Sequence, residues 1–282
     1  MRELAGRVAV VTGAASGIGR ALAERCADEG MRLVLADVEA APLAVVAEGL
    51  RARGCEVEDA VLDVRDATTL EALADRCQAR FGGAHLLCNN AGVAVGGTVW
   101  EVNEEDWSWI LGVNLVGVIH GIRAFLPRML GGGEEGHVVN TASIAGLTCP
   151  AFIGPYNVTK HAVVALSESL LNDLRASGSQ IGVSVLCPGW VQTRIHESDR
   201  NKPGGPDEDS ANPDLAGMRE LVASMIAGGI EPAVVADQVL AAIREDRFWI
   251  RTHPAMEPMV EERCKAIVAG DAPPLMLPTE IQ

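Results

Sequence analysis

The chain has 282 residues, of which 48% are hydrophobic and 22% are charged, and its formal net charge is −15. This length suits one large domain or two small ones, and the apolar fraction excludes global disorder. A net negative charge repels nucleic acid and anionic lipid, so we expect no nucleic-acid partner and no membrane partner.

Seven cysteines are scattered through the sequence without a C-x-x-C pair. An odd, dispersed count indicates reduced thiols rather than disulfides or zinc, so we expect a cytoplasmic protein without a metal. Residues 1–7 carry charges where a signal peptide needs an apolar core. The apolar segment 107–122 is shorter than a bilayer span.

Short apolar runs alternate with helix-like segments along the chain. The predicted strands are residues 8–11, 33–36, 57–62, 85–88, 137–141, 183–187 and 248–250. The predicted helices are residues 18–29, 42–53, 69–81, 105–130, 156–176 and 232–245. This alternation predicts an α/β fold, a doubly wound, Rossmann-like parallel sheet of about seven strands with helices on both faces. We expect a single domain over residues 1–282.

Two segments near the C-terminal end depart from this alternation. Residues 198–217 are polar and rich in proline and glycine, which predicts a loop. A loop of this length is typical of a lid or of a disordered segment, and we expect a substrate-binding lid over residues 194–230. The tail 270–282 contains three prolines, so we expect it to be flexible or to contact another subunit.

A glycine-rich turn, Thr12-Gly13-Ala14-Ala15-Ser16-Gly17-Ile18-Gly19, lies between the first predicted strand and the first predicted helix. Glycines allow close approach to a pyrophosphate, and a helix N-terminus attracts phosphate. The strand–turn–helix context favours a dinucleotide site over a merely tight turn. The expected cofactor contacts here are Gly13, Ser16, Gly17, Ile18 and Gly19.

Asp37 ends the second predicted strand. A carboxylate there can accept hydrogen bonds from the adenosine ribose and repels a 2′-phosphate, which favours NAD over NADP. Arg20 could reach such a phosphate, and Asp37 could instead be an ordinary turn residue. Ligands of doubly wound sheets bind at the carboxyl ends of strands. Further residues expected at those ends are Asp63, Val64, Asn90, Ala91, Gly92, Ser143, Pro188 and Gly189.

The single tyrosine, Tyr156, precedes Lys160 by four residues, so both side chains share one face of a predicted helix. A free phenol has a pKa of about 10, and a nearby ammonium favours the phenolate. We therefore expect Lys160 to lower the pKa of Tyr156, while Ser143 offers a hydroxyl to a reacting oxygen. Taken alone, the spacing also suits an ordinary surface tyrosine.

Together these motifs resemble the short-chain dehydrogenase/reductase family, in its compact single-domain subtype. The resemblance covers roughly residues 5–250. The matching residues are Thr12-Gly13-x3-Gly17-x-Gly19, Asn89-Asn90-Ala91-Gly92, Asn114-Leu115-Val116-Gly117, Ser143, Tyr156-x3-Lys160 and Pro188-Gly189-x3-Thr193.

The resemblance implies a role for each matching residue. Tyr156 would be the acid/base, Lys160 would hold the nicotinamide ribose, and Ser143 would bind the substrate oxygen. Asn114 would hold a water that links Lys160 to solvent. The remaining implied cofactor contacts are Asp63, Val64, Asn90, Ala91, Gly92, Pro188, Gly189, Val191 and Thr193. Similar proteins are commonly tetramers, so we expect a homo-oligomer (tetramer or dimer).

Substrate contacts are predicted from position alone, because the resemblance does not extend to specificity. His161 follows Lys160 in the sequence and would point about 100° away from it on a helix, which indicates a structural role rather than that of a base.

The candidate substrate contacts are mostly apolar and suggest a substrate with a hydrophobic body. They are Val95, Ser143, Cys149, Phe152 and Trp190.

The expected activity is hydride transfer between NAD(H) and a small hydrophobic secondary alcohol or ketone, with tyrosine as general acid/base. One alternative is an NADP-dependent carbonyl reductase of the same family. Another is a non-catalytic dinucleotide-binding sensor. A sensor should have lost one of the four catalytic positions, whereas all four are present.

Overall fold

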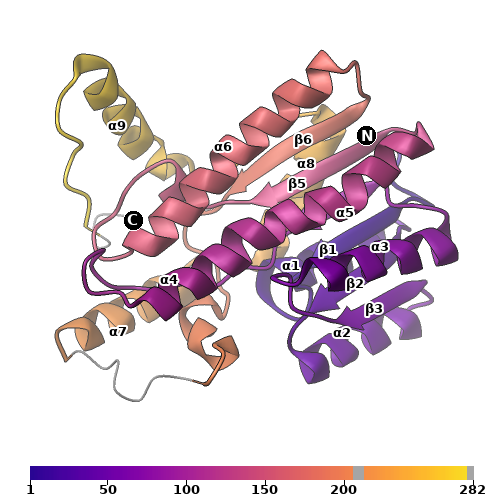
Figure 1. Cartoon of the computed structure of the whole chain (residues 1–282), viewed down its shortest axis with the longest axis horizontal. Helices are drawn as coiled ribbons and strands as arrows, with labels where there is room; N and C mark the ends of the chain where they lie inside the picture. The colour runs from indigo at the N-terminus through magenta and orange to yellow at the C-terminus, as the bar shows by residue number, and fades with distance from the viewer. Residues whose placement is uncertain (206–212, 278–282) are drawn as a thin grey trace.

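The computed structural model describes residues 1–205 and 213–277. Within these residues, seven strands form one parallel sheet in the order β3-β2-β1-β4-β5-β6-β7 (Figure 1). The predicted doubly wound, single-domain fold is therefore confirmed. The strands are β1 (Val8–Thr12), β2 (Arg32–Asp37), β3 (Val57–Val61), β4 (Leu86–Asn89), β5 (Gly136–Thr141), β6 (Ile181–Cys187) and β7 (Trp249–Arg251).

Helices cover both faces of the sheet (Figure 1). One face packs against α1 (Gly17–Asp28), α2 (Ala40–Ala52) and α8 (Pro232–Glu245). The other face packs against α3 (Ala67–Phe81), α5 (Gly117–Gly132) and α6 (Gly154–Ala176). The further elements are α4 (Glu104–Leu111), the π-helix η1 (Gly112–Val116), the 3₁₀ helices η2 (Ile144–Gly146), η3 (Ile195–Asn201) and η5 (Pro254–Met256), α7 (Pro213–Ala227) and α9 (Glu257–Ala269).

The apolar run of β1 reflects burial on both faces. Ala9 and Val11 join the core on the α1 side, whereas Val8 and Val10 join the core on the α3 side. A strand buried on both faces must be continuously apolar. The more polar β3 is an edge strand, and Glu58 on it forms ion pairs with arginines of α3.

The strand order reverses between β1 and β4, which are neighbours although β2 and β3 separate them in the chain. The crossover connections from these two strands leave in opposite directions, so a crevice forms at their carboxyl ends. This is the edge of the sheet at which the sequence places its candidate site residues.

The predicted single helix 105–130 is wrong in detail, because a π-helical turn, η1, separates α4 from α5. Close packing explains the interruption. A Cβ on Gly117 would lie 2.6 Å from Cγ2 of Val64, and Asn114 is tied to the backbone of Val93. Tertiary contacts thus favour a π-helical turn at this place, and the spacing of apolar residues in the sequence does not predict it.

The predicted loop 198–217 is partly helical. η3 extends to Asn201 and α7 begins at Pro213, where proline suits the first turn of a helix. Residues 206–212 lie outside the described part. The sequence also gave no sign of α9, whose residues are all at least partly exposed, so apolar periodicity could not mark it.

The described part of the tail, residues 271–277, packs on its own chain. Met276 is buried, and its carbonyl accepts a hydrogen bond of 2.9 Å from the Ala151 N–H. The tail therefore touches the loop that precedes α6. Residues 278–282 lie outside the described part, so for them it stays a prediction that the tail is flexible or contacts another subunit.

One helical stretch, 104–132, is long and apolar enough to cross a membrane, with a mean hydropathy of 1.6. Of its most apolar window, 56% is buried inside the fold. Core helices of globular proteins show the same length and composition.

Candidate active site

A cavity of about 990 Å³ lies at the carboxyl ends of the strands. Residues that directly follow six strands, β1 to β6, contribute to its wall. The candidate catalytic and cofactor residues that line it are Gly13, Ser16, Gly17, Ile18, Asp37, Asp63, Val64, Asn90, Ala91, Gly92, Ser143, Tyr156, Lys160, Pro188, Gly189, Val191 and Thr193. Gly19 and Asn114 lie behind this wall.

The glycine turn fits closely against neighbouring loops. Gly13 and Gly17 have positive φ angles of 68° and 52°. A Cβ on Gly13 would lie 2.8 Å from Cα of Ala91, and one on Gly19 would lie 2.0 Å from the Gly13 carbonyl oxygen. Larger residues would disrupt the turn, which is the reason for three glycines at this spacing.

The N-terminus of α1 points its free N–H groups to the same turn. Ser16 is the N-cap, and no side-chain capping bond and no acidic first-turn residue are found here in the described structure. The first-turn N–H groups and the helix dipole can therefore bind the phosphates of a dinucleotide. The turn thus fits a nicotinamide dinucleotide.

Asp37, at the end of β2, lines the cavity next to the glycine turn. Its Oδ2 accepts a hydrogen bond of 2.9 Å from the Ala15 N–H, and its Oδ1 accepts one of 2.9 Å from the Glu39 N–H. Burial raises the pKa of Asp37, while these two N–H donors act in the opposite direction. The carboxylate is thereby held beside the glycine turn, where ribose hydroxyls would bind.

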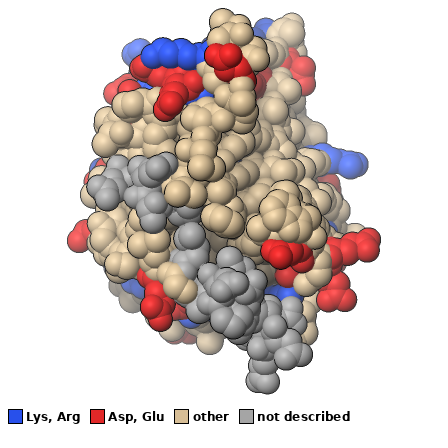
Figure 2. Space-filling model, turned by 90° about the vertical axis from the view of Figure 1, so that its left-hand side faces the viewer, with Lys and Arg blue, Asp and Glu red and all other residues tan. Residues whose placement is uncertain are grey.

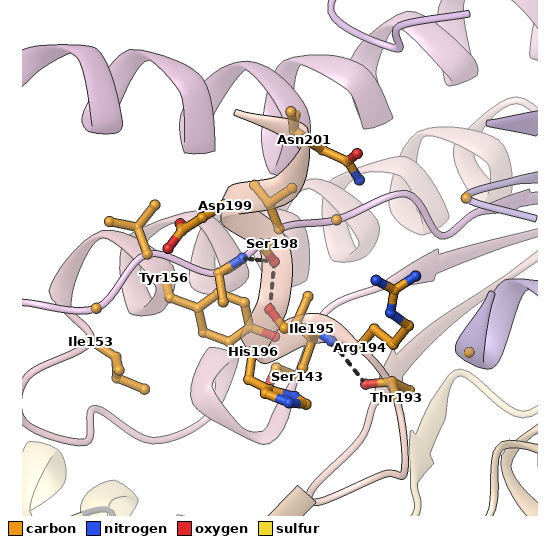
Figure 3. Close-up of a pocket in the computed structure, with 18 of the residues that line it drawn as sticks. Ser143, Ile153, Tyr156, Thr193, Arg194, Ile195, His196, Ser198, Asp199 and Asn201 are labelled. Atoms are coloured by element: carbon orange, nitrogen blue, oxygen red, sulfur yellow. Dashed lines mark hydrogen bonds between the residues drawn. The ribbon is translucent and has the colours of Figure 1, made fainter. Parts of the chain in front are cut away.

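Ser143 and Tyr156 meet inside the cavity (Figure 3). Ser143 Oγ accepts a hydrogen bond of 3.1 Å from the Ala145 N–H and lies 3.4 Å from the Pro188 carbonyl oxygen. The Tyr156 side chain lies beside Ser143 (Figure 3), whose hydroxyl acts to lower the pKa of the phenol. Two hydroxyls at one point can bind a single substrate oxygen.

The pKa of Tyr156 is raised, not lowered as the sequence led us to expect. Burial of the phenol is the main cause, and the hydrogen bond with Ser143 acts in the opposite direction. A phenolate loses its hydration on burial, which disfavours the charged form. The Lys160 ammonium lies 5.4 Å from the Tyr156 ring centroid, so it faces the ring rather than pairing with the hydroxyl.

Lys160 is almost fully buried on α6. Its Nζ donates a hydrogen bond of 3.0 Å to the Thr141 carbonyl at the end of β5. Burial lowers the pKa of Lys160 to about 8, because an ammonium is costly to desolvate. Its protonation state can therefore change close to neutral pH.

Asn114 lies within η1 and is 1% exposed. Its Oδ1 accepts a hydrogen bond of 2.8 Å from the Val93 N–H, and its Nδ2 donates to the Val93 carbonyl at 2.9 Å. Nδ2 also donates to Thr159 Oγ1 at 3.2 Å. The side chain thus joins the segment after β4 to α6, and its implied role with a water stays a prediction.

Three of the predicted substrate contacts, Val95, Phe152 and Trp190, line the cavity together with Ser143. Cys149 is exposed and is not among the described lining residues, so the structure does not bring it together with the other predicted substrate contacts. The preceding Thr148 is fully buried and donates to the Ile144 carbonyl at 2.9 Å. This turn leaves Cys149 on the outer side.

Several lining residues were not predicted individually, although three of them lie within the predicted lid 194–230. Ile153, Ile195, His196 and Asp199 lie around Tyr156 and Ser143 (Figure 3). Most come from η3, whose position over the cavity depends on contacts distant in sequence. Trp109 of α4 also lines the cavity.

Long-range polar contacts hold η3 over the cavity. Ser198 Oγ accepts a hydrogen bond of 3.0 Å from the Ala94 N–H after β4. Lys202 forms an ion pair of 2.8 Å with Asp106 of α4. The start of the predicted lid is therefore attached to the segment after β4 and to α4.

The family model for short chain dehydrogenases matches residues 7–204. The chain belongs to the short-chain dehydrogenase/reductase family. The resemblance predicted from the sequence is thereby confirmed, and this family member is an oxidoreductase with the fold of enzymes that use NAD or NADP. Among the described residues, no group of three His, Cys, Asp or Glu side chains could hold a metal ion.

Two relatives and one solved structure illustrate the similarity. A Burkholderia phymatum short-chain dehydrogenase/reductase in complex with NAD is 46% identical, with a TM-score of 0.94 over 98% of this chain and 100% of that chain. A 1-deoxy-11-beta-hydroxypentalenate dehydrogenase of Streptomyces avermitilis is 38% identical over 87% of this chain and 84% of its own. A CLA biosynthesis dehydrogenase/reductase of Lactiplantibacillus plantarum is 31% identical over 97% of each chain.

Proposed function

We propose that the protein interconverts a secondary alcohol and a ketone on a largely apolar substrate, with NAD(H) as cofactor. The observation that carries this proposal is the convergence of Ser143, Tyr156 and Lys160 in one cavity with the glycine turn. A relative named as a hydroxypentalenate dehydrogenase and a related structure bound to NAD support the reaction class and the cofactor.

The side chains divide the reaction between them. When bound, the cofactor would supply the hydride-transfer chemistry. Ser143 Oγ and Tyr156 Oη hydrogen-bond the substrate oxygen and stabilise the charge that develops on it. In the oxidation direction Oη takes the hydroxyl proton, and in the reduction direction it returns a proton to the oxygen. Lys160, whose Nζ is held by the Thr141 carbonyl, would bind the nicotinamide ribose hydroxyls.

The apolar residues that line part of the cavity support the proposal of an apolar substrate. Trp109, Phe152, Trp190 and Ile226 line it, whereas His196 and Asp199 offer a few polar contacts. The face of the molecule on the side of α7 and α9 shows mainly uncharged side chains at its centre and charged ones toward its edges (Figure 2). A hydrophobic molecule bearing one hydroxyl or carbonyl suits such a site.

The reaction can be tested by following cofactor reduction over a panel of secondary alcohols. The panel should include steroid-like, terpenoid and aryl alcohols, each with NAD and with NADP. We expect turnover of apolar alcohols with NAD. A protein that binds NAD but turns over no alcohol or ketone in the panel would favour the non-catalytic sensor instead.

Asp37 provides the test of cofactor preference. Asp37→Ala should weaken NAD binding more than NADP binding, because it removes both the ribose acceptor and the repulsion of a 2′-phosphate. Asp37→Asn is the matched control, since the amide keeps an acceptor oxygen without the charge. Equal losses for the two cofactors would refute the ribose role of Asp37, and paired titrations of the wild type with NAD and NADP would decide whether the protein is instead the NADP-dependent reductase.

We further propose that residues 194–230 form a lid over the substrate. The polar contacts of Ser198 with the segment after β4 and of Lys202 with α4 support this role for η3. Limited proteolysis across 198–217 should slow when cofactor and substrate are both present. Cleavage at an unchanged rate would contradict a lid.

We also propose that the protein is a homo-oligomer and that it is located in the cytoplasm. Apolar side chains on the helices of the expected subunit contact are exposed, including Leu130 on α5 at 44% and Val158 on α6 at 47%. Buried against a second copy, they would gain favourable transfer energy. Sedimentation analysis should give a dimer or tetramer, and a monomer at micromolar concentration would contradict this part.

A further inference from the structure

A thiol and an imidazole lie together outside the cavity. Cys149 Sγ is 3.8 Å from His161 Nε2. The other ring nitrogen, Nδ1, lies 3.0 Å from the Asn157 carbonyl oxygen, which can only accept a hydrogen bond. Nδ1 therefore carries the proton of the neutral ring, and Nε2 presents its lone pair to the thiol.

The surroundings of His161 suit proton transfer from Cys149. Burial and the nearby Arg263 lower the pKa of His161, so the ring is neutral and free to accept a proton near pH 7. The carbonyls of Asn157 and Ala145 favour the protonated ring once the proton has moved.

The other cysteines lack this combination. Burial raises the pKa of Cys26 and Cys187 to about 12 and that of Cys77 to about 11, so these thiols stay protonated. Cys264 is exposed like Cys149, and no contact with an imidazole is found for it within the described chain. Cys264 is therefore a built-in reference thiol.

We propose that Cys149 is a nucleophilic modification site for soft electrophiles of the α,β-unsaturated carbonyl class, with His161 as its base. His161 Nε2 removes the thiol proton, and Sγ forms a bond to the β-carbon of the electrophile. The π electrons move to the α-carbon, which then takes the proton from the imidazolium. The addition needs no oxidant or leaving group, and it does not depend on the proposed alcohol oxidation.

The position of Cys149 links modification to the cavity. It directly precedes Pro150, whose carbonyl accepts a hydrogen bond of 2.8 Å from Asn157 Nδ2. Two residues on, the Phe152 carbonyl accepts one of 2.7 Å from the Gly97 N–H. Pro150 and Phe152 both line the cavity, so a bulky adduct on Cys149 displaces its rim. Modification should raise KM for the substrate more than it lowers kcat.

The test uses the full-length protein and limiting N-ethylmaleimide, which is itself an α,β-unsaturated carbonyl compound. Peptide mass mapping at pH 7 should show Cys149 modified at least about tenfold faster than Cys264. In His161→Gln the Cys149 rate should fall to that of Cys264. Equal rates in the wild type, or an unchanged Cys149 rate in His161→Gln, would overturn the proposal.

A second measurement needs no variant at position 161. The wild-type ratio of the Cys149 rate to the Cys264 rate should shrink toward one at high pH, because hydroxide then replaces the imidazole as the base for an exposed thiol. A ratio that stays constant with pH would show that only accessibility differs. Cys149→Ser should keep its substrate KM on maleimide treatment, and a KM that still rises would overturn the link to the cavity.

Discussion

Arg200 of η3 and Glu39, the N-cap of α2, form a two-point ion pair although they are 161 residues apart. Nε of Arg200 lies 3.1 Å from Oε1 of Glu39, and Nη2 lies 2.9 Å from Oε2. Both side chains are mostly buried and line the cavity, Glu39 close to Asp37. The pair therefore connects the expected adenosine end of the site to the start of the proposed lid.

Arg200→Ala should weaken cofactor binding severalfold, because η3 loses its attachment at that end. In a double-mutant cycle with Glu39→Gln, the coupling should be about 1 kcal/mol, measured from cofactor Kd values. Arg53→Ala is the control, since its pair with Asp28 is exposed and should contribute little. Additive effects of the Arg200 and Glu39 changes would refute the coupling.

The same pair predicts a pH dependence. Arg200 holds the pKa of Glu39 below its ordinary value. The stabilisation is therefore complete above the ordinary glutamate pKa of about 4.3 and is lost as pH falls through the lowered pKa. The difference in stability between wild type and Arg200→Ala should shrink on acidification. A difference that grows in acid would contradict this assignment.

Tyr156→Phe should reduce kcat by at least about 10²–10⁴-fold while cofactor Kd stays within twofold or so, because only the proton-transfer oxygen is removed. Stopped-flow turnover and cofactor fluorescence titration measure the two quantities. Ser143→Ala is a useful companion, since it removes the second hydroxyl without changing the phenol. Near-wild-type turnover in Tyr156→Phe would sink the proposed mechanism.

The single tyrosine also makes its ionisation directly observable. Ultraviolet titration of the phenolate should give a pKa above the ordinary value of about 10, because burial dominates. Ser143→Ala should raise it further, since the Ser143 hydrogen bond acts to lower it. A wild-type pKa below 10 would restore the original expectation that Lys160 controls the phenol.

Lys160→Met should abolish turnover and yet stabilise the folded protein. Burial lowers the lysine pKa from 10.5 to about 8, so keeping the charge inside costs up to about 3 kcal/mol near pH 7. Between pH 8 and 10 the unfolded state binds more protons, and wild-type stability should rise with pH relative to Lys160→Met. Denaturant unfolding at several pH values checks both statements, and a destabilised Lys160→Met at pH 7 would contradict the first.

Phe152 lies at the cavity rim with a φ of 63°, in the left-handed region. Phe152→Gly should relieve backbone strain of about 1 kcal/mol and at the same time raise KM for a bulky apolar substrate. Phe152→Ala is the matched control, because it removes the ring but keeps the strain. Thermal unfolding and KM should therefore separate the two variants. Equal stability of the Phe152→Gly and Phe152→Ala variants would show that the backbone strain at this position is negligible.

Much of this protein follows from local sequence patterns. Continuous apolar runs predict buried parallel strands, and the Gly13-to-Gly19 turn predicts a phosphate site, because both depend on residues that are near in the chain. The spacing of Tyr156 and Lys160 likewise follows from helix geometry. The fold, the family and the group of residues around the cavity could therefore be predicted.

Only the tertiary structure decided how these groups are charged and what surrounds them. Burial by distant elements raises the pKa of Tyr156 and lowers that of Lys160, and a sequence does not state how deeply a side chain is buried. The turn at Thr148 moves Cys149 away from the cavity and toward His161. The contact of Arg200 with Glu39 joins segments 161 residues apart. Local patterns record backbone preference and apolar period, whereas desolvation and long-range pairing arise only when the chain has folded.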